Sequence, residues 1–120
     1  METLPDVLKV SCLQWDIKLK NFKANLEAFD RLLDKALDEG SNLVILPEMW
    51  SQCFCGSKLV EEAENLSERL EICAERALKN KIWIAAGTLP EPAPDGKVFN
   101  TFFLFDSKGR RRLSYRKVHL

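Results

Sequence analysis

The spacing of apolar and polar positions in the first third of the chain predicts a strand, a helix and a second strand. Residues 7–14 are mostly apolar and are typical of a buried strand. From Phe22 the apolar residues recur at spacings of three and four, which is one face of a helix, and Gly40 follows as a C-terminal stop signal. Residues 43–46 then form a short, wholly apolar strand. Strand, helix and strand in this order predict a right-handed βαβ unit with parallel pairing.

The remaining pattern predicts a second helical region, a third buried strand and an antiparallel hairpin. The helical region runs from about Lys58 to Asn80, with its apolar stripe from Leu66 onward, and residues 82–87 form the strand. A loop marked by Pro90, Pro92, Pro94 and the Asp95-Gly96 turn leads to a strand over 98–106, which turns at 107–109 and returns over 112–118. The fold class is therefore α/β, with a mixed sheet and helices on one face.

Glu48 follows directly after the apolar strand 43–46 and after Pro47, which cannot continue a ladder because it has no N–H to donate. In α/β folds the carboxyl ends of strands are where ligands bind. Met49 and Trp50 could form an apolar pocket wall, and desolvation raises the pKa of a carboxyl group, which suits a general base. The competing interpretation is a helix-capping or surface-paired glutamate.

Lys117 lies near the end of the last predicted strand. Alternation places Tyr115, Lys117 and His119 on one face of that strand, and Arg116 and Val118 on the other. A lysine in this position is commonly a surface side chain that keeps its charge in water. Near a buried glutamate it could instead hold the carboxylate in place or stabilise an oxyanion during acyl transfer.

The charge balance argues against nucleic-acid binding, since 18 Lys and Arg offset 18 Asp and Glu. No apolar run is long enough to span a bilayer, and the N-terminus lacks the pattern of a signal peptide, so we expect a cytoplasmic protein. Cys12 and Cys73 are expected to fill the core. Cys53 and Cys55 form a C-x-C pair, but the only histidine, His119, is far away in sequence, so no metal site is expected. The basic run 110–112 is expected to protect a strand edge in solvent rather than to bind phosphate.

Several segments together resemble the nitrilase superfamily, the carbon–nitrogen hydrolases. The matching segments are Gln14, the helix 22–40, Asn42-Leu43-Val44-Ile45-Leu46-Pro47-Glu48, Ile82-Trp83-Ile84-Ala85-Ala86-Gly87, Phe99-Asn100-Thr101 and Tyr115-Arg116-Lys117-Val118-His119-Leu120. The resemblance implies the N-terminal half of an α-β-β-α sandwich and a Glu–Lys–Cys catalytic set without a cofactor. Glu48 would be the general base and Lys117 would stabilise the tetrahedral intermediate. A cysteine would attack an amide or nitrile carbon and form a thioester.

The chain departs from the family pattern because the nucleophilic cysteine is expected beyond Leu120. Residues 1–120 are therefore expected to be a partial domain that is inactive alone; Cys53 or Cys55 as a substitute thiol is the less favoured interpretation. The expected substrate is a small carboxamide rather than a nitrile, on the general resemblance to amidases; no residue of the sequence decides between the amidase, nitrilase and carbamoylase branches. The expected partner is a second copy or a complementing C-terminal segment, since a half sandwich leaves apolar sheet surface uncovered.

Two other functions stay open at the level of sequence. The chain could be a catalytically dead remnant that serves as a binding or oligomerisation module. It could also be an unrelated flavodoxin-like domain, although residues 15–21 lack the glycines that would cradle a phosphate.

Overall fold

Five strands form one sheet in the order β1-β2-β3-β4-β5, so neighbours in sequence are neighbours in space. The computed structural model describes residues 6–52 and 56–118. The strands are β1 (Val10–Cys12), β2 (Leu43–Ile45), β3 (Trp83–Pro92), β4 (Val98–Phe105) and β5 (Arg111–Arg116). β1, β2 and β3 pair in parallel, and β4 and β5 extend the sheet by antiparallel pairing. The mixed sheet of the prediction is confirmed.

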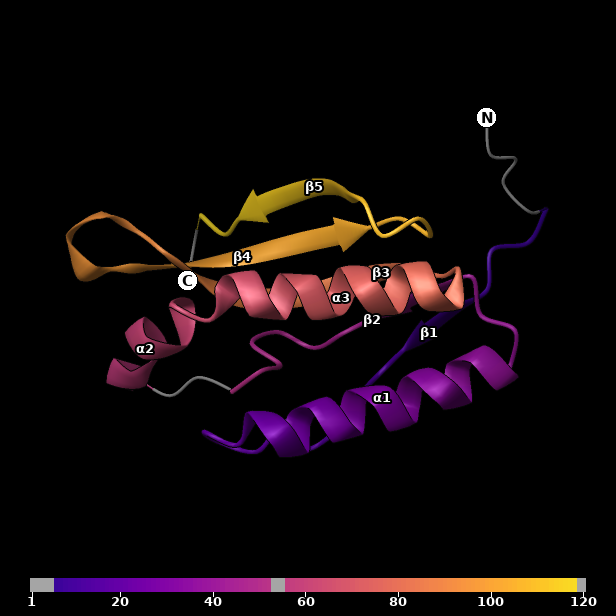
Figure 1. The fold of residues 1–120 in the computed structure, drawn as a ribbon, viewed down its shortest axis with the longest axis horizontal. Helices are drawn as coiled ribbons and strands as arrows, with labels where there is room; N and C mark the ends of the chain where they lie inside the picture. The colour runs from indigo at the N-terminus through magenta and orange to yellow at the C-terminus, as the bar shows by residue number, and fades with distance from the viewer. Residues whose placement is uncertain (1–5, 53–55, 119–120) are drawn as a thin grey trace.

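The helices cover one face of this sheet, as predicted (Figure 1). They are α1 (Phe22–Asp38), α2 (Leu59–Ala63) and α3 (Leu66–Asn80), with two short 3-10 turns, η1 (Gly56–Lys58) and η2 (Pro94–Gly96). Asn21 caps the N-terminus of α1, since its side chain accepts a hydrogen bond from the N–H of Ala24. The core lies between these helices and the sheet. It includes Phe29 and Leu33 of α1, Cys73 and Ala77 of α3, and Val44, Ile84 and Phe105 of the strands. The apolar period predicted these helical faces correctly.

The predicted helical region from Lys58 to Asn80 is interrupted between α2 and α3. Glu62 is buried at this break and accepts hydrogen bonds from Gln52, Asn65 and Arg69. The Arg69 guanidinium, itself 6% exposed, also lies 3.4 Å from the ring centroid of Phe22. A buried carboxylate requires partners on several sides. The break between α2 and α3 thus lies where Gln52, Asn65 and Arg69 surround the Glu62 carboxylate.

Two strands differ in length from the prediction. β1 comprises only Val10–Cys12, and the apolar Val7 and Leu8 before it are exposed, because the edge strand has a partner on one side alone. β3 continues to Pro92, through the prolines that predicted a loop. β2 ends at Ile45, so the far part of β3 has a strand neighbour only in β4 among the described residues. A proline without an N–H is tolerated on such a free edge.

The β4–β5 hairpin is held by the buried carboxylate of Asp106. Its oxygens accept hydrogen bonds from the N–H of Lys108 at 2.9 Å, the N–H of Arg110 at 3.0 Å and the Arg110 guanidinium at 2.9 Å. Burial raises the pKa of Asp106, and these hydrogen bonds outweigh burial and hold the pKa at about 2. Arg110 and Arg112 therefore have a partner in the hairpin as well as an edge position.

We expect a pH-dependent loss of stability from Asp106. Because its folded pKa lies below the ordinary value of 3.8, its contribution is present above about pH 4 and disappears as the pH falls to about 2. The contribution is about 2 kcal/mol in free energy of unfolding. Asp106→Asn should lower the urea midpoint near neutral pH and match the wild type near pH 2. Asp95→Asn, in an exposed turn, is the control; equal midpoints of Asp106→Asn and wild type near neutral pH would contradict this account.

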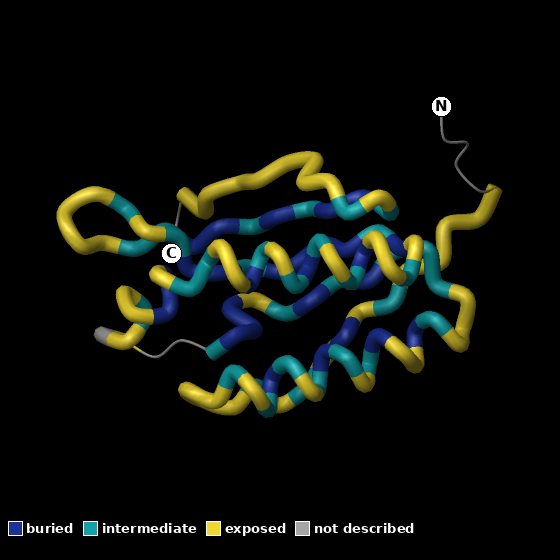
Figure 2. The backbone as a smooth tube through the Cα atoms, in the orientation of Figure 1, coloured by how far each residue is buried: buried dark blue, intermediate teal, exposed yellow. Residues whose placement is uncertain are grey.

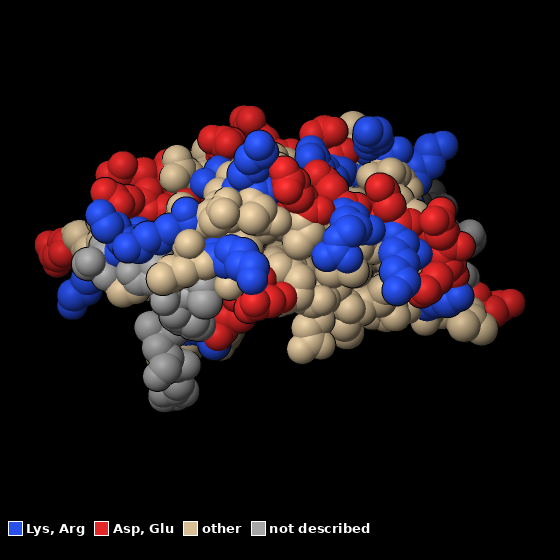
Figure 3. All heavy atoms as spheres, turned by 90° about the horizontal axis from the view of Figure 1, so that it is seen from below, with Lys and Arg blue, Asp and Glu red and all other residues tan. Residues whose placement is uncertain are grey.

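The sheet face opposite the helices is apolar and has no cover among the described residues. One register row crosses all five strands on that face through Cys12, Ile45, Ala85, Leu104 and Leu113. Leu113 is 47% exposed, and Figure 2 shows β5 exposed along its length beside the largely buried β3 and β4. In Figure 3 the helix side lies at the top and carries most of the charged side chains, whereas the lower middle of the view is uncharged. A face of this kind is typical of a sheet that packs against another layer.

Candidate active site

Glu48 stands in the turn that follows β2, and the two residues after it are bonded to β3. Met49 adopts a left-handed backbone with φ of 51°, and its N–H donates to the Thr88 hydroxyl at 2.9 Å. The Trp50 side chain is fully buried, and its indole N–H donates to the Ala86 carbonyl at 3.1 Å. The turn is thus tied to β3 at two successive residues, which restricts where the Glu48 carboxylate can lie.

Gly87 allows β3 to touch this turn. It has a φ of +58°, and a Cβ built on it would lie 2.0 Å from the Pro47 carbonyl oxygen and 2.6 Å from the Leu46 carbonyl oxygen. The pairing of β3 with β4 also shifts register between Ala85 and Thr88, at the same place. At Gly87 the backbone of β3 therefore comes close to the backbone of the turn, which only a residue without a side chain allows. This contact holds the backbone of the turn that carries Glu48 against β3.

Lys117 follows β5 directly and reaches the same carboxylate. Its ammonium group donates to Oε2 of Glu48, across 69 positions of sequence. The carboxyl ends of β2 and β5 lie at the same end of the sheet, which is why the two side chains meet (Figure 1). The structure therefore brings together the two residues that the sequence singled out.

Asn100 of β4 contacts both members of this pair. Its side-chain N–H donates to Oε2 of Glu48 at 3.3 Å, and its main-chain oxygen accepts from the N–H of Lys117 at 2.9 Å. Asn100 is 3% exposed. A buried amide thus joins the turn after β2 to the residue after β5.

A second polar cluster holds the end of β5, immediately before Lys117. The Arg116 guanidinium donates to both oxygens of Glu91 at 2.7 and 3.3 Å, and the Thr101 hydroxyl donates to Glu91 at 2.9 Å. The hydrogen bond from Arg116 lowers the pKa of Glu91, and the same hydrogen bond raises the pKa of Arg116. Arg116 also lies over the ring of Phe99, 4.3 Å from its centroid. These contacts join β3, β4 and β5 where Lys117 leaves the sheet.

The expected burial of Glu48 is wrong for the described part of the chain. Its side chain is 40% exposed, and that of Lys117 is 39% exposed. Met49 and Trp50 do not form a pocket wall around the carboxylate, because both are buried in the core. In the described structure Lys117 and Asn100 are the hydrogen-bond partners of the Glu48 carboxylate.

The cysteines divide into three cases. Cys73 is buried, as expected, and burial raises the pKa of its thiol to about 12, which keeps it protonated. Cys12 is exposed, contrary to expectation, because its side chain points to the uncovered face of the sheet. Cys53, Cys55 and His119 lie outside the described residues. Within 6–52 and 56–118, no three His, Cys, Asp or Glu side chains are placed to hold a metal ion.

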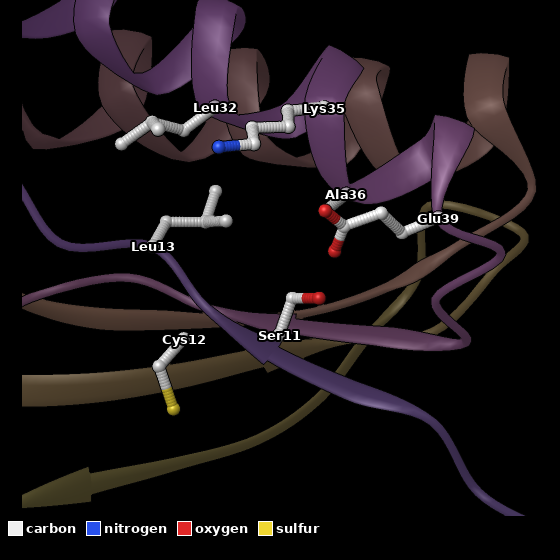
Figure 4. A pocket seen from close by; sticks show the side chains of 7 residues that line it. All are labelled: Ser11, Cys12, Leu13, Leu32, Lys35, Ala36 and Glu39. Carbon is white, nitrogen blue, oxygen red and sulfur yellow. The ribbon is translucent and has the colours of Figure 1, made fainter.

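A cavity of about 250 Å³ lies between α1 and β1, away from the Glu48–Lys117 pair (Figure 4). Its lining includes Leu13, Lys35 and Glu39, whereas the sulfur of Cys12 points away from it. This cavity therefore does not present the Cys12 thiol to a molecule inside it.

No helix in the described part of the chain is long and apolar enough to cross a bilayer.

Sequence reasoning did not assign Asn100 or Glu91 to the site. Asn100 appeared only as part of the Phe99-Asn100-Thr101 segment, and Glu91 fell in the predicted proline loop. The available signal was a polar residue within a strongly apolar strand, since Asn100 precedes the run 102–105. A buried polar side chain in such a strand needs a partner.

The comparison with known proteins gives similar sequences of amidase type. The chain is 30% identical over 102 residues to nitrilase homolog 2 of Dictyostelium discoideum, covering 83% of this chain and 31% of that protein. It is 29% identical over 104 residues to the chloroplastic omega-amidase of Arabidopsis thaliana, covering 82% and 28% respectively. The chain thus spans about a third of the length of these relatives.

Solved structures share its fold. An amidase from Nesterenkonia superposes with a TM-score of 0.84 at 23% identity, over 94% of this chain and 43% of that one. Saccharomyces cerevisiae Nit3, a member of branch 10 of the nitrilase superfamily, superposes with a TM-score of 0.83 at 28% identity, over 93% and 44%. The α/β fold is therefore the nitrilase fold over somewhat less than half of its length.

The family model described as carbon-nitrogen hydrolase matches residues 9–120, which include the turn with Glu48, the segment around Asn100 and Lys117. This match covers almost the whole chain. The chain belongs to the carbon–nitrogen hydrolases of the nitrilase superfamily.

Proposed function

We propose that this chain supplies the general base and the oxyanion-stabilising lysine of an amidase-type carbon–nitrogen hydrolase. The observation that carries the proposal is the ion pair between Glu48 and Lys117, formed by residues that follow two different strands. A carboxylate beside an ammonium group offers an acceptor for a proton and a fixed positive charge at one place. These are the two properties that acyl transfer from an amide requires.

The proposed reaction uses these groups in two steps. The Glu48 carboxylate takes the proton of a cysteine thiol, whose sulfur attacks the amide carbon while the Lys117 ammonium group stabilises the negative oxygen. The carbon–nitrogen bond then breaks, the amine leaves with the proton held by Glu48, and a thioester remains. In the second step Glu48 takes a proton from water, which attacks the thioester and releases the acid and the thiol.

The thiol in this proposal comes from a segment outside residues 1–120. Cys73 is buried in the core with a raised pKa, and Cys12 lies on the uncovered sheet face, so neither is offered as the nucleophile. The relatives are about three times longer than this chain, so the activity proposed is that of a longer protein.

The substrate class is proposed from the relatives. Variants of the Nesterenkonia amidase have been crystallised with acrylamide and with butyramide. In another variant the acetamide moiety of fluoroacetamide is added covalently at the active-site cysteine. We therefore propose a small carboxamide as the substrate.

A fusion of residues 1–120 to the remaining part of Saccharomyces cerevisiae Nit3 tests the proposal. It should release ammonia from butyramide, and Glu48→Gln or Lys117→Met should each lower kcat/KM by about 100-fold or more. Glu75→Gln is the control, because Glu75 lies on α3 and pairs with Arg76, away from the site. An active fusion that keeps its activity in Glu48→Gln would refute the assignment.

The unfused chain provides a second test, since it should not hydrolyse butyramide. Turnover by the pure 120-residue chain that is lost in Glu48→Ala would show that its own thiols suffice and would overturn the placement of the nucleophile.

The uncovered apolar face of the sheet supports a second function, that of a binding or oligomerisation module. The coding sequence after Leu120 distinguishes the two. A continuation with a cysteine in a strand-to-turn segment favours the enzyme, and a stop codon there favours the module.

A further inference from the structure

Asn100 is the residue that touches both proposed catalytic groups from a third segment of the chain. It lies on β4, paired with Pro90 of β3, and is 3% exposed. Its side-chain N–H donates to Oε2 of Glu48 at 3.3 Å, the same oxygen that accepts from the Lys117 ammonium group. Its main-chain oxygen accepts the N–H of Lys117 at 2.9 Å.

We propose that Asn100 is the positioning residue of the Glu48–Lys117 pair, an assignment that rests on the proposed function of that pair. The amide fixes one carboxylate oxygen of Glu48, and the main-chain hydrogen bond fixes the point from which the Lys117 side chain starts. One buried residue therefore holds both members of the ion pair in place. Without it, two half-exposed side chains in water would sample many arrangements.

The side-chain oxygen of Asn100, which has no hydrogen-bond partner among the described residues, bears on the role of this residue. This atom, Oδ1, is buried. Leaving a buried acceptor unpaired costs free energy, so packing alone would favour an apolar residue here. The donor on Nδ2 gives a reason for an amide at this position, since a leucine has no N–H to offer Glu48.

A carboxylate of the same shape would serve the pair badly. It would lie beside Glu48 and compete with it for the charge of Lys117. A neutral donor avoids this competition, and the surrounding strands hold it in place. Thr101 and Arg116, which pair with each other across β4 and β5, both donate to Glu91 and so lock the strands next to Asn100.

Carbodiimide coupling on the full 120-residue chain tests this assignment. The reagent activates a carboxylate, and a neighbouring lysine amine then displaces the activating group as a urea, leaving an amide bond between the two side chains. Mass spectrometry of the digested protein measures the yield of the Glu48–Lys117 link. The Lys18–Asp16 pair, at 2.7 Å on the surface, provides a reference link in the same sample.

We expect Asn100→Leu to lower the Glu48–Lys117 yield about fivefold relative to the reference link, as the loss of one ordinary hydrogen bond would. Thr101→Val is the matched control, because it removes a hydrogen bond of the adjacent buried residue without touching Glu48; its yield should stay at the wild-type level. An unchanged relative yield in a folded Asn100→Leu protein would overturn the proposal.

Asn100→Asp decides the matter if Asn100→Leu does not fold. The new carboxylate should compete for Lys117, so part of the coupling should move from Glu48 to residue 100. Coupling that stays entirely at Glu48 would contradict a positioning role. Because this measurement needs no turnover, its outcome is independent of whether the fusion enzyme hydrolyses an amide.

Discussion

Gly87→Ala is expected to lower the free energy of unfolding by about 4 kcal/mol, a large share of the 5–15 kcal/mol of a typical domain. The new Cβ would lie 2.0 Å from the Pro47 oxygen and 2.6 Å from the Leu46 oxygen, and both are main-chain atoms. The turn cannot easily withdraw, because the N–H of Leu46 donates to the Ala85 oxygen at 2.9 Å. Urea unfolding followed by tryptophan fluorescence measures the change.

Gly96→Ala is the matched control for this substitution. Gly96 also has a positive φ, +70°, but a Cβ there meets no atom within 4 Å. Gly96→Ala should therefore lower the free energy of unfolding by only about 1 kcal/mol, the cost of placing an alanine in a left-handed backbone conformation. The difference between the two variants isolates the contact between β3 and the turn that carries Glu48. Similar urea midpoints for both would show that this contact yields without cost.

The second expected result is self-association through the uncovered face of the sheet. The apolar row from Cys12 to Leu113 crosses five strands without a helix over it in the described part of the chain. Buried apolar area drives association, and a face of this kind seldom stays open to water. Size-exclusion chromatography with light scattering should show dimers or larger species whose proportion rises with protein concentration.

Leu113→Ser should weaken this association. Fully burying a leucine side chain contributes roughly 2 kcal/mol. Leu113 is 47% exposed, so its burial at an interface should contribute about half of that free energy in each copy. For a dimer with the residue on both sides, the dissociation constant should rise about 30-fold. Leu78→Ser, at a 57% exposed position on α3, should leave it unchanged. A monodisperse wild-type monomer that unfolds cooperatively would contradict the prediction.

The pattern of the sequence was sufficient for the architecture because it records burial directly. The apolar periods from Phe22 and over about Lys58 to Asn80 predicted helices on one face, and the apolar runs at 43–46 and 82–87 predicted buried strands. These elements bury their apolar sides against one another, so the apolar period of each segment marks the side that packs on its neighbours. The errors fall where burial is one-sided or local, at the exposed start of β1 and at Pro90 and Pro92 on a free edge.

The candidate site could be located in part. Glu48 after a strand and Lys117 at the end of another were visible in the sequence, and the family resemblance linked them. The roles of Asn100 and Glu91 were not visible, because they depend on contacts between residues 10 to 52 positions apart on different strands and turns. The exposure of Glu48 was also misjudged, since the apolar Met49 and Trp50 turn into the core rather than around the carboxylate.

By itself the sequence determined the order and type of the elements, the family and the two charged residues at strand ends, because local periodicity and short motifs specify these. Only the tertiary structure decided that Glu48 and Lys117 form a pair, that Asn100 joins them, and that Gly87 presses the turn against β3. These features arise where strands distant in sequence end at one edge of the sheet. Their geometry is set by the register of the strands and by the space available between backbones, which no single segment of the chain encodes.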